Sequence, residues 1–97
     1  MKSPVEYDEV DTWHNLDADG KAKYKKVNGV IFVSIANYPV TPNSTTTVGT
    51  LPTDYCPEST ISGYADGEGT AYVYPSGVVT VKTTINSAYA TLSYPSK

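Results

Sequence analysis

One short segment near the N-terminus, WHNLDAD, combines side chains of the kinds that bind sugars. Trp13 offers an aromatic face for the C–H surface of a sugar ring, and His14, Asp17 and Asp19 offer groups that hydrogen-bond its hydroxyls. Because these residues lie within seven positions, a single loop could present them together. We interpret the four residues as candidate saccharide ligands. The alternative is that Trp13 covers the core at the base of the first strands.

Tyrosines provide a second candidate ligand site, since the chain has nine of them. In the strand predicted over residues 70–74, Tyr72 and Tyr74 fall on one face, and Ala71 and Val73 on the other. A tyrosine-rich sheet face can bind sugars or another protein, and it can equally be a ladder of cross-strand aromatic contacts. Tyr72 and Tyr74 are therefore further candidate saccharide ligands, with these alternatives open.

The one cysteine, Cys56, could in principle be a nucleophile or a metal ligand. A catalytic thiol needs a nearby base, but the one histidine is about forty positions away, and Asp54 and Glu58 flank the thiol with negative charge. A single cysteine also excludes an intramolecular disulfide and a multi-cysteine zinc site. We expect Cys56 to be a small, partly buried side chain in a structured loop.

Residues 15–26 resemble the start of a calcium-binding loop, with Asn or Asp at its first, third and fifth positions and Gly20 at its sixth. The twelfth position should be a bidentate Glu, and here it is Lys26. We therefore predict a polar turn and no metal site, with a looser cation site at Asp17 and Asp19 as the weaker alternative.

The sequence contains no P-loop, no paired-carboxylate motif and no recognisable Ser/His/Asp arrangement. We therefore expect no catalytic residues and no cofactor, and we predict that the protein is not an enzyme. A formal net charge of −3 and the complete lack of arginine argue against a nucleic-acid partner. No apolar stretch is long enough for a secretion signal or a membrane span, so we expect synthesis in the cytosol and no membrane insertion.

Composition and periodicity predict an all-β protein. The chain is rich in Val, Thr and Tyr, which favour strands, and turn residues recur about every eight to twelve positions, which is typical of a β-sandwich or barrel. The charge is unevenly distributed, with four acidic residues within positions 6–11 and four lysines within positions 21–26. Solvated strand faces would explain this pattern, and so would an intersubunit or intermodule contact. We predict an N-terminal arm or first strand over 1–12 and a single β-sandwich domain over 13–97.

Two strand predictions are specific. Asn28-Gly29 is a favoured type I′ turn, so it should join a strand ending near Val27 to one starting at Val30. The strand over 30–36 is apolar on both faces, which indicates burial on both sides, by the N-terminal arm or by another subunit. Further strands are predicted over 46–50, 61–64, 70–74, 78–85 and 88–94. In the fourth of these, Val79, Val81 and Ile85 should point inward and Thr80, Lys82 and Thr84 outward.

The order of three segments resembles C-terminal modules in tail, baseplate and receptor-binding proteins of phages that infect Gram-positive bacteria. The segments are YKKVNGVIFVSI, VGTLPTDYCPEST and TAYVYPSGVVTV. Those modules often contain an NG hairpin, a GTLPxGYrP segment and a final hairpin of the form xxGxVtv. This chain departs from the second pattern at Asp54, where Gly is usual, and at Cys56, where Arg is frequent.

The resemblance implies an antiparallel, jelly-roll-like β-sandwich built from short strands and hairpins. It implies a structural module of the receptor-binding-head type in the phage tail or baseplate, assembled in the host cytoplasm. Its expected partners are a host cell-wall saccharide, other phage tail proteins and, because such heads commonly trimerise, two further copies of itself. Two alternatives stay open, namely a virion accessory or adaptor protein that binds no ligand, and a carbohydrate-binding module associated with a hydrolase.

Overall fold

The computed structural model describes residues 12–96, so nearly all of the arm predicted over 1–12 lies outside the described residues. The elements are β1 (His14–Asn15), β2 (Ala22–Val27), β3 (Val30–Pro39), β4 (Thr46–Thr50), the 3₁₀ helix η2 (Thr53–Tyr55), β5 (Ile61–Ala65), β6 (Gly69–Val73), β7 (Val78–Lys82) and β8 (Ser87–Pro95). The described strands join in one eight-stranded sheet in the order β1-β2-β3-β8-β5-β6-β7-β4, and every pairing in it is antiparallel. The all-β, antiparallel prediction is confirmed.

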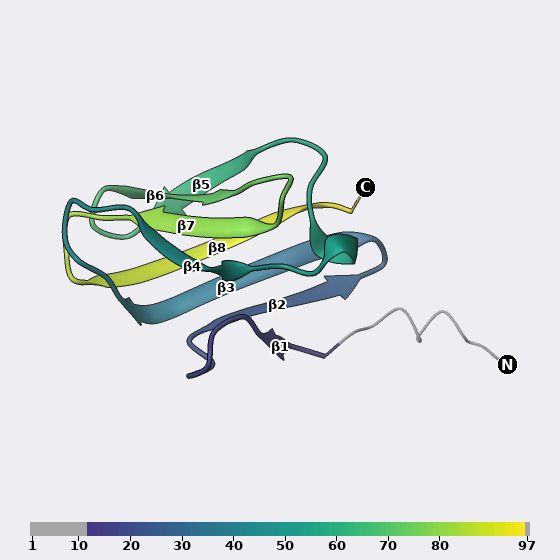
Figure 1. Ribbon diagram of the computed structural model, residues 1–97, viewed down its shortest axis with the longest axis horizontal. Helices are drawn as coiled ribbons and strands as arrows, with labels where there is room; N and C mark the ends of the chain where they lie inside the picture. Colours follow the sequence, from purple (N-terminus) through teal and green to yellow (C-terminus); the bar gives the residue numbers. More distant parts are fainter. Residues whose placement is uncertain (1–11, 97) are drawn as a thin grey trace, which may run out of the picture.

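The sheet is curled, with β2 and β3 on one side of the molecule and β6 and β7 on the other (Figure 1). Two irregularities in the pairing help to bend it. One lies in β3 between Ile35 and Tyr38, where Asn37 has a φ of 54°, and the other lies in β4 between Thr47 and Gly49. Such bulges bend a strand and increase its twist, which lets one sheet wrap around its own core.

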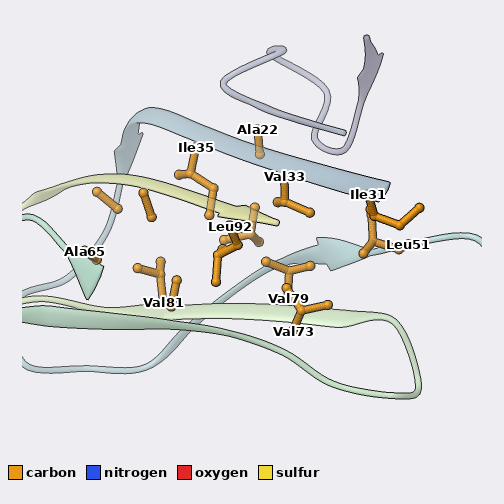
Figure 2. Packing of buried hydrophobic residues seen from close by; sticks show 14 of the residues in the cluster. Ala22, Ile31, Val33, Ile35, Leu51, Ala65, Val73, Val79, Val81 and Leu92 are labelled. Atoms are coloured by element: carbon orange, nitrogen blue, oxygen red, sulfur yellow. The ribbon is translucent and has the colours of Figure 1, made fainter. Parts of the chain in front are cut away.

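The core is aliphatic and lies inside this curl. Ile31 and Val33 of β3 point toward Val73 of β6 and toward Val79 and Val81 of β7 (Figure 2), and all five side chains are fully buried. Burial of each such side chain stabilises the fold by about 1.5–3 kcal/mol. This burial gives the strands a fixed inner face, and it leaves their outer faces available for contacts with solvent, ligands or other chains.

The β2–β3 hairpin confirms the prediction made from Asn28-Gly29. The two residues have φ values of 52° and 81°, as a type I′ turn requires, and Val27 pairs directly with Val30. Within residues 12–96, the outer face of β3 is only partly covered, since Val30 is 37% exposed and Phe32 is half-buried. The arm or second subunit predicted to cover this face lies outside the described residues, so burial on both faces stays a prediction. The neighbours of β3 in the sheet, namely β2 and β8, pair with its edges and not with its outer face.

The C-terminal strands form where they were predicted, but β7 is shorter than expected. It ends at Lys82, and Ile85, which was predicted to point inward, is 42% exposed. The chain turns at this point because the Thr83 hydroxyl donates a hydrogen bond to the Ile85 carbonyl oxygen at 2.7 Å and accepts one from the Ile85 amide. Thr80 shares the outer face with Lys82 as predicted, yet its side chain is buried.

Because the sheet curls, Leu16, which follows β1, lies against Gly49 of β4. The two edge strands of the sheet, β1 and β4, are therefore close to each other. A Cβ atom at Gly49 of β4 would lie 2.9 Å from both the Cγ atom and the carbonyl oxygen of Leu16. Only glycine permits this approach without displacement of the neighbouring backbone. Leu16 also packs against the core, so this contact fixes the position of β1 and of the residues that flank it.

Candidate functional site

The loop around Cys56 is a packed structural element. Cys56 is 4% exposed, and its thiol donates a hydrogen bond to the Pro52 carbonyl oxygen at 3.4 Å. Gly77, with a φ of 94°, approaches so closely that a Cβ there would lie 2.6 Å from the Leu51 carbonyl oxygen and 3.0 Å from the Cys56 sulfur. The prediction of a small side chain in a structured loop is confirmed, and the side chain is more completely buried than the partial burial that was predicted.

Tyr94 of β8 also anchors this loop. Its hydroxyl donates a hydrogen bond of 2.7 Å to the carbonyl oxygen of Tyr55, and its side chain is 3% exposed. Burial raises the pKa of Tyr94 well above the usual value for tyrosine, and the neighbouring Cys56 raises it further. Tyr94 therefore stays neutral at physiological pH and serves as an anchor for the loop.

Trp13 lies on the surface rather than over the core. Its side chain is 44% exposed, and the Lys25 ammonium lies 4.5 Å from the centre of its ring, within the range of a cation–π contact. Together with side chains of β2 and β3 it borders a shallow groove of about 340 Å³. The groove is lined by Trp13, Gly20, Lys21, Lys23, Ser34 and Ala36.

The other three residues of the N-terminal segment differ in their surroundings. The half-buried His14 ring lies 5.2 Å from the Tyr24 ring and 6.1 Å from the Tyr55 ring, in a small aromatic cluster. Asp17 stabilises the predicted polar turn, because its Oδ1 atom accepts a 2.9 Å hydrogen bond from the Ala22 amide. Asp19 is exposed to solvent. Of this segment, Trp13 and Asp19 thus have the most exposed candidate groups.

Tyr72 and Tyr74 lie on the outer face, as predicted, while Ala71 and Val73 of the same strand are fully buried. The two tyrosine rings stack, with their centroids 5.9 Å apart and an interplanar angle of 18°. Tyr72 is 37% exposed and Tyr74 is half-buried. We call this stacked pair the tyrosine platform.

The tyrosine platform lines a groove of about 420 Å³ on the outer face of β6 and β7. The other side chains that line it are mostly hydroxyl or amide groups, with one carboxylate and one ammonium; the lining comprises Asn43, Thr45, Glu68, Gly69, Thr70, Thr80, Val81, Lys82, Thr83 and Thr84. An aromatic surface beside many neutral hydrogen-bonding groups suits a ligand with C–H faces and hydroxyls. We call this hollow the tyrosine groove.

Thr80 is a residue of the tyrosine groove whose burial the sequence pattern did not predict. Alternation placed it on the outer face, where a threonine is usually solvated. It is 7% exposed instead. The groove that it lines also includes Asn43 and Thr45 from the loop before β4, far away in the sequence. No local signal could have predicted this burial.

The six predicted ligand residues do not form one site. The groove beside Trp13 and the tyrosine groove share no lining residue. β2 and β6 are separated in the sheet by β3, β8 and β5, and they lie on opposite sides of the molecule (Figure 1). The two surfaces must therefore be tested as separate candidates.

Within residues 12–96, no three His, Cys, Asp or Glu side chains come together in a way that could hold a metal ion. The same part of the chain contains no helix that is long and apolar enough to cross a membrane.

The fold is similar to that of a phage protein of known structure, the head domain of lactococcal phage bIL170, which was described in a study of a common fold for the receptor-binding domains of lactococcal phages. The match has a TM-score of 0.55 with 21% sequence identity, and it covers 90% of this chain and 99% of that one. No protein-family model matches the chain, and no curated protein matches it. The likeness confirms, for the fold, the resemblance noted in the sequence.

Proposed function

We propose that this chain is a phage receptor-binding module that attaches the virion to a saccharide of the host cell wall. The observation that carries this proposal is the fold shared with a phage head domain over almost the whole length of both chains. Residues 13–97 would form one module with a jelly-roll-like β-sandwich fold. The module would not be an enzyme. It would work in the virion tail or baseplate among other tail proteins, after assembly in the host cytoplasm.

The chemistry of the outer surface supports a saccharide as the ligand. Trp13, Tyr72 and Tyr74 provide aromatic faces for sugar C–H groups. The tyrosine groove surrounds its platform with hydroxyl and amide groups that can both donate and accept hydrogen bonds. Of the two candidate surfaces, the tyrosine groove offers the larger volume and more neutral polar groups, so we propose it as the principal site.

Co-sedimentation with purified cell walls of Gram-positive bacteria tests this function. The purified chain should sediment with the walls of at least one strain, and it should stay in solution when the wall polysaccharide has first been extracted. A virion accessory protein would sediment with neither preparation. Binding that survives removal of the polysaccharide would contradict the saccharide proposal and point to another wall component.

We further propose that three copies associate through the outer face of β3. Val30 is 37% exposed and Phe32 is half-buried on that face, and burial of such apolar surface favours association. Light scattering at micromolar concentration should then give three times the chain mass of 10.4 kDa. A mass that stays at one chain would contradict the trimer, and substitution of Phe32 by Ser should convert the trimer to monomers.

A further inference from the structure

We propose that the hydroxyl of Thr80 is a ligand contact on the floor of the tyrosine groove, where it exchanges hydrogen bonds with a sugar hydroxyl. This inference rests on the proposed saccharide-binding function and identifies a residue that determines recognition. Thr80 was not among the residues that the sequence singled out as ligands.

The first observation is an unsatisfied polar atom. Among residues 12–96, Thr80 is the one whose buried side-chain oxygen or nitrogen has no hydrogen-bond partner. Thr83 and Thr84 lie nearby in the same groove lining, and their hydroxyls donate to the carbonyl oxygens of Ile85 and Gly67 at 2.7 and 2.6 Å. Buried polar groups are paired in most proteins, and an unpaired one lowers stability, so its retention calls for an explanation.

The second observation is the position of Thr80 next to the tyrosine platform. Thr80 pairs directly with Tyr72 across β6 and β7, and with Thr47 across β7 and β4. Side chains directly opposite each other in antiparallel strands share a face and lie in contact range. The Thr80 hydroxyl is therefore beside the stacked rings, where a sugar lying on the platform would direct its equatorial hydroxyls.

Access to the Thr80 hydroxyl would require a neighbouring side chain to move. The oxygen is covered in the ligand-free protein, and Tyr72 opposite it is 37% exposed. Exposed side chains change rotamer within nanoseconds. A rotation of the Tyr72 ring on ligand entry would uncover the hydroxyl while the ring keeps its contact with the sugar.

The chemistry of the contact indicates the ligand class. A threonine hydroxyl donates one hydrogen bond and accepts others, so it complements a sugar hydroxyl, which does the same. The charged side chains in the lining are Glu68 and Lys82, one of each sign, so the groove has no excess charge to favour a polyanion. We infer that the groove receives a neutral, polyhydroxylated sugar unit of the wall polysaccharide.

The variant Thr80→Val tests the inference, with Thr47→Val as the matched control. Val keeps the branched shape of threonine and removes only the hydroxyl. Thr47 is the cross-strand neighbour of Thr80, but it is exposed and does not line the tyrosine groove. Each protein is titrated against immobilised polysaccharide that has been extracted from the walls that the wild type sediments with, and its melting temperature is measured.

Thr80→Val should bind about tenfold more weakly, because one hydrogen bond to the sugar is lost. It should also melt about 5 °C higher, because an unpaired buried hydroxyl is removed. Thr47→Val should bind as the wild type does. Opposite effects on binding and stability are not expected of a residue with a purely structural role.

Unchanged binding of Thr80→Val, or an equal loss of binding in both variants, would overturn the inference while the proposed function stands. A wild type that binds no wall polysaccharide would overturn the proposed function, and the Thr80 contact with it. The two failures are therefore distinguishable in one experiment.

Discussion

Replacement of Gly69 by alanine should destabilise the protein by about 3 kcal/mol, because the added methyl group has no room beside the facing backbone. Gly69 begins β6, and a Cβ there would collide with the carbonyl oxygen of Lys82 and lie 2.9 Å from the Cα of Thr83. Both atoms belong to the backbone of the facing segment, so the β6–β7 pair would have to open. In a domain of this size, the melting temperature should fall by about 12–24 °C.

Gly63→Ala is the matched control for this prediction. It also places a methyl group on a strand, but the nearest atom is the Cδ2 of Leu92 at 2.8 Å, the end of a side chain that can adjust. We expect a change of less than about 1 kcal/mol in the free energy of unfolding, measured by urea titration. Equal losses in the two variants would contradict the packing described here between β6 and β7.

Removal of the tyrosine platform should produce the largest loss of binding. Tyr72→Ala combined with Tyr74→Ala takes away both stacked rings, and we expect about 2 kcal/mol less binding free energy for wall polysaccharide, or about a 30-fold higher Kd. The fold should persist, since both side chains lie on the outer face and neither belongs to the buried core. Biosensor titration of the folded variant measures the effect.

Two further variants show whether the loss is specific. Tyr64→Ala removes a tyrosine that is 69% exposed and lies outside the groove lining, so it should bind as the wild type does. Trp13→Ala tests the other candidate surface and should have a smaller effect than the double variant. If Trp13→Ala abolishes binding and the double variant binds normally, the site lies beside β2 and the tyrosine groove is not the principal site.

Local features of the fold could be predicted from the sequence because their causes are local. Asn28-Gly29 specifies its own turn geometry, since both residues accept positive φ. The two faces of β6 follow from alternation, which put Tyr72 outward and Val73 inward. The position of β4 and the loop around Cys56 likewise followed from glycine and proline punctuation.

Features that depend on distant contacts could not be predicted in this way. The exposure of Ile85 results from a side-chain hydrogen bond of Thr83 that ends β7 early. The approach of Leu16 to Gly49 depends on how far the whole sheet curls. The candidate site shows the same division. Alternation found the tyrosine pair, whereas the groove beside it also includes Asn43 and Thr45, which lie far away in the sequence.

The most direct test of the central claim, that this chain recognises a host wall saccharide, is calorimetric titration of the purified chain with polysaccharide released from walls that it sediments with. We expect saturable binding that the double tyrosine variant loses and Tyr64→Ala retains. If circular dichroism shows that the chain is folded and no wall polysaccharide produces heat or binding, the claim is contradicted. The chain would then have only a structural role in the virion.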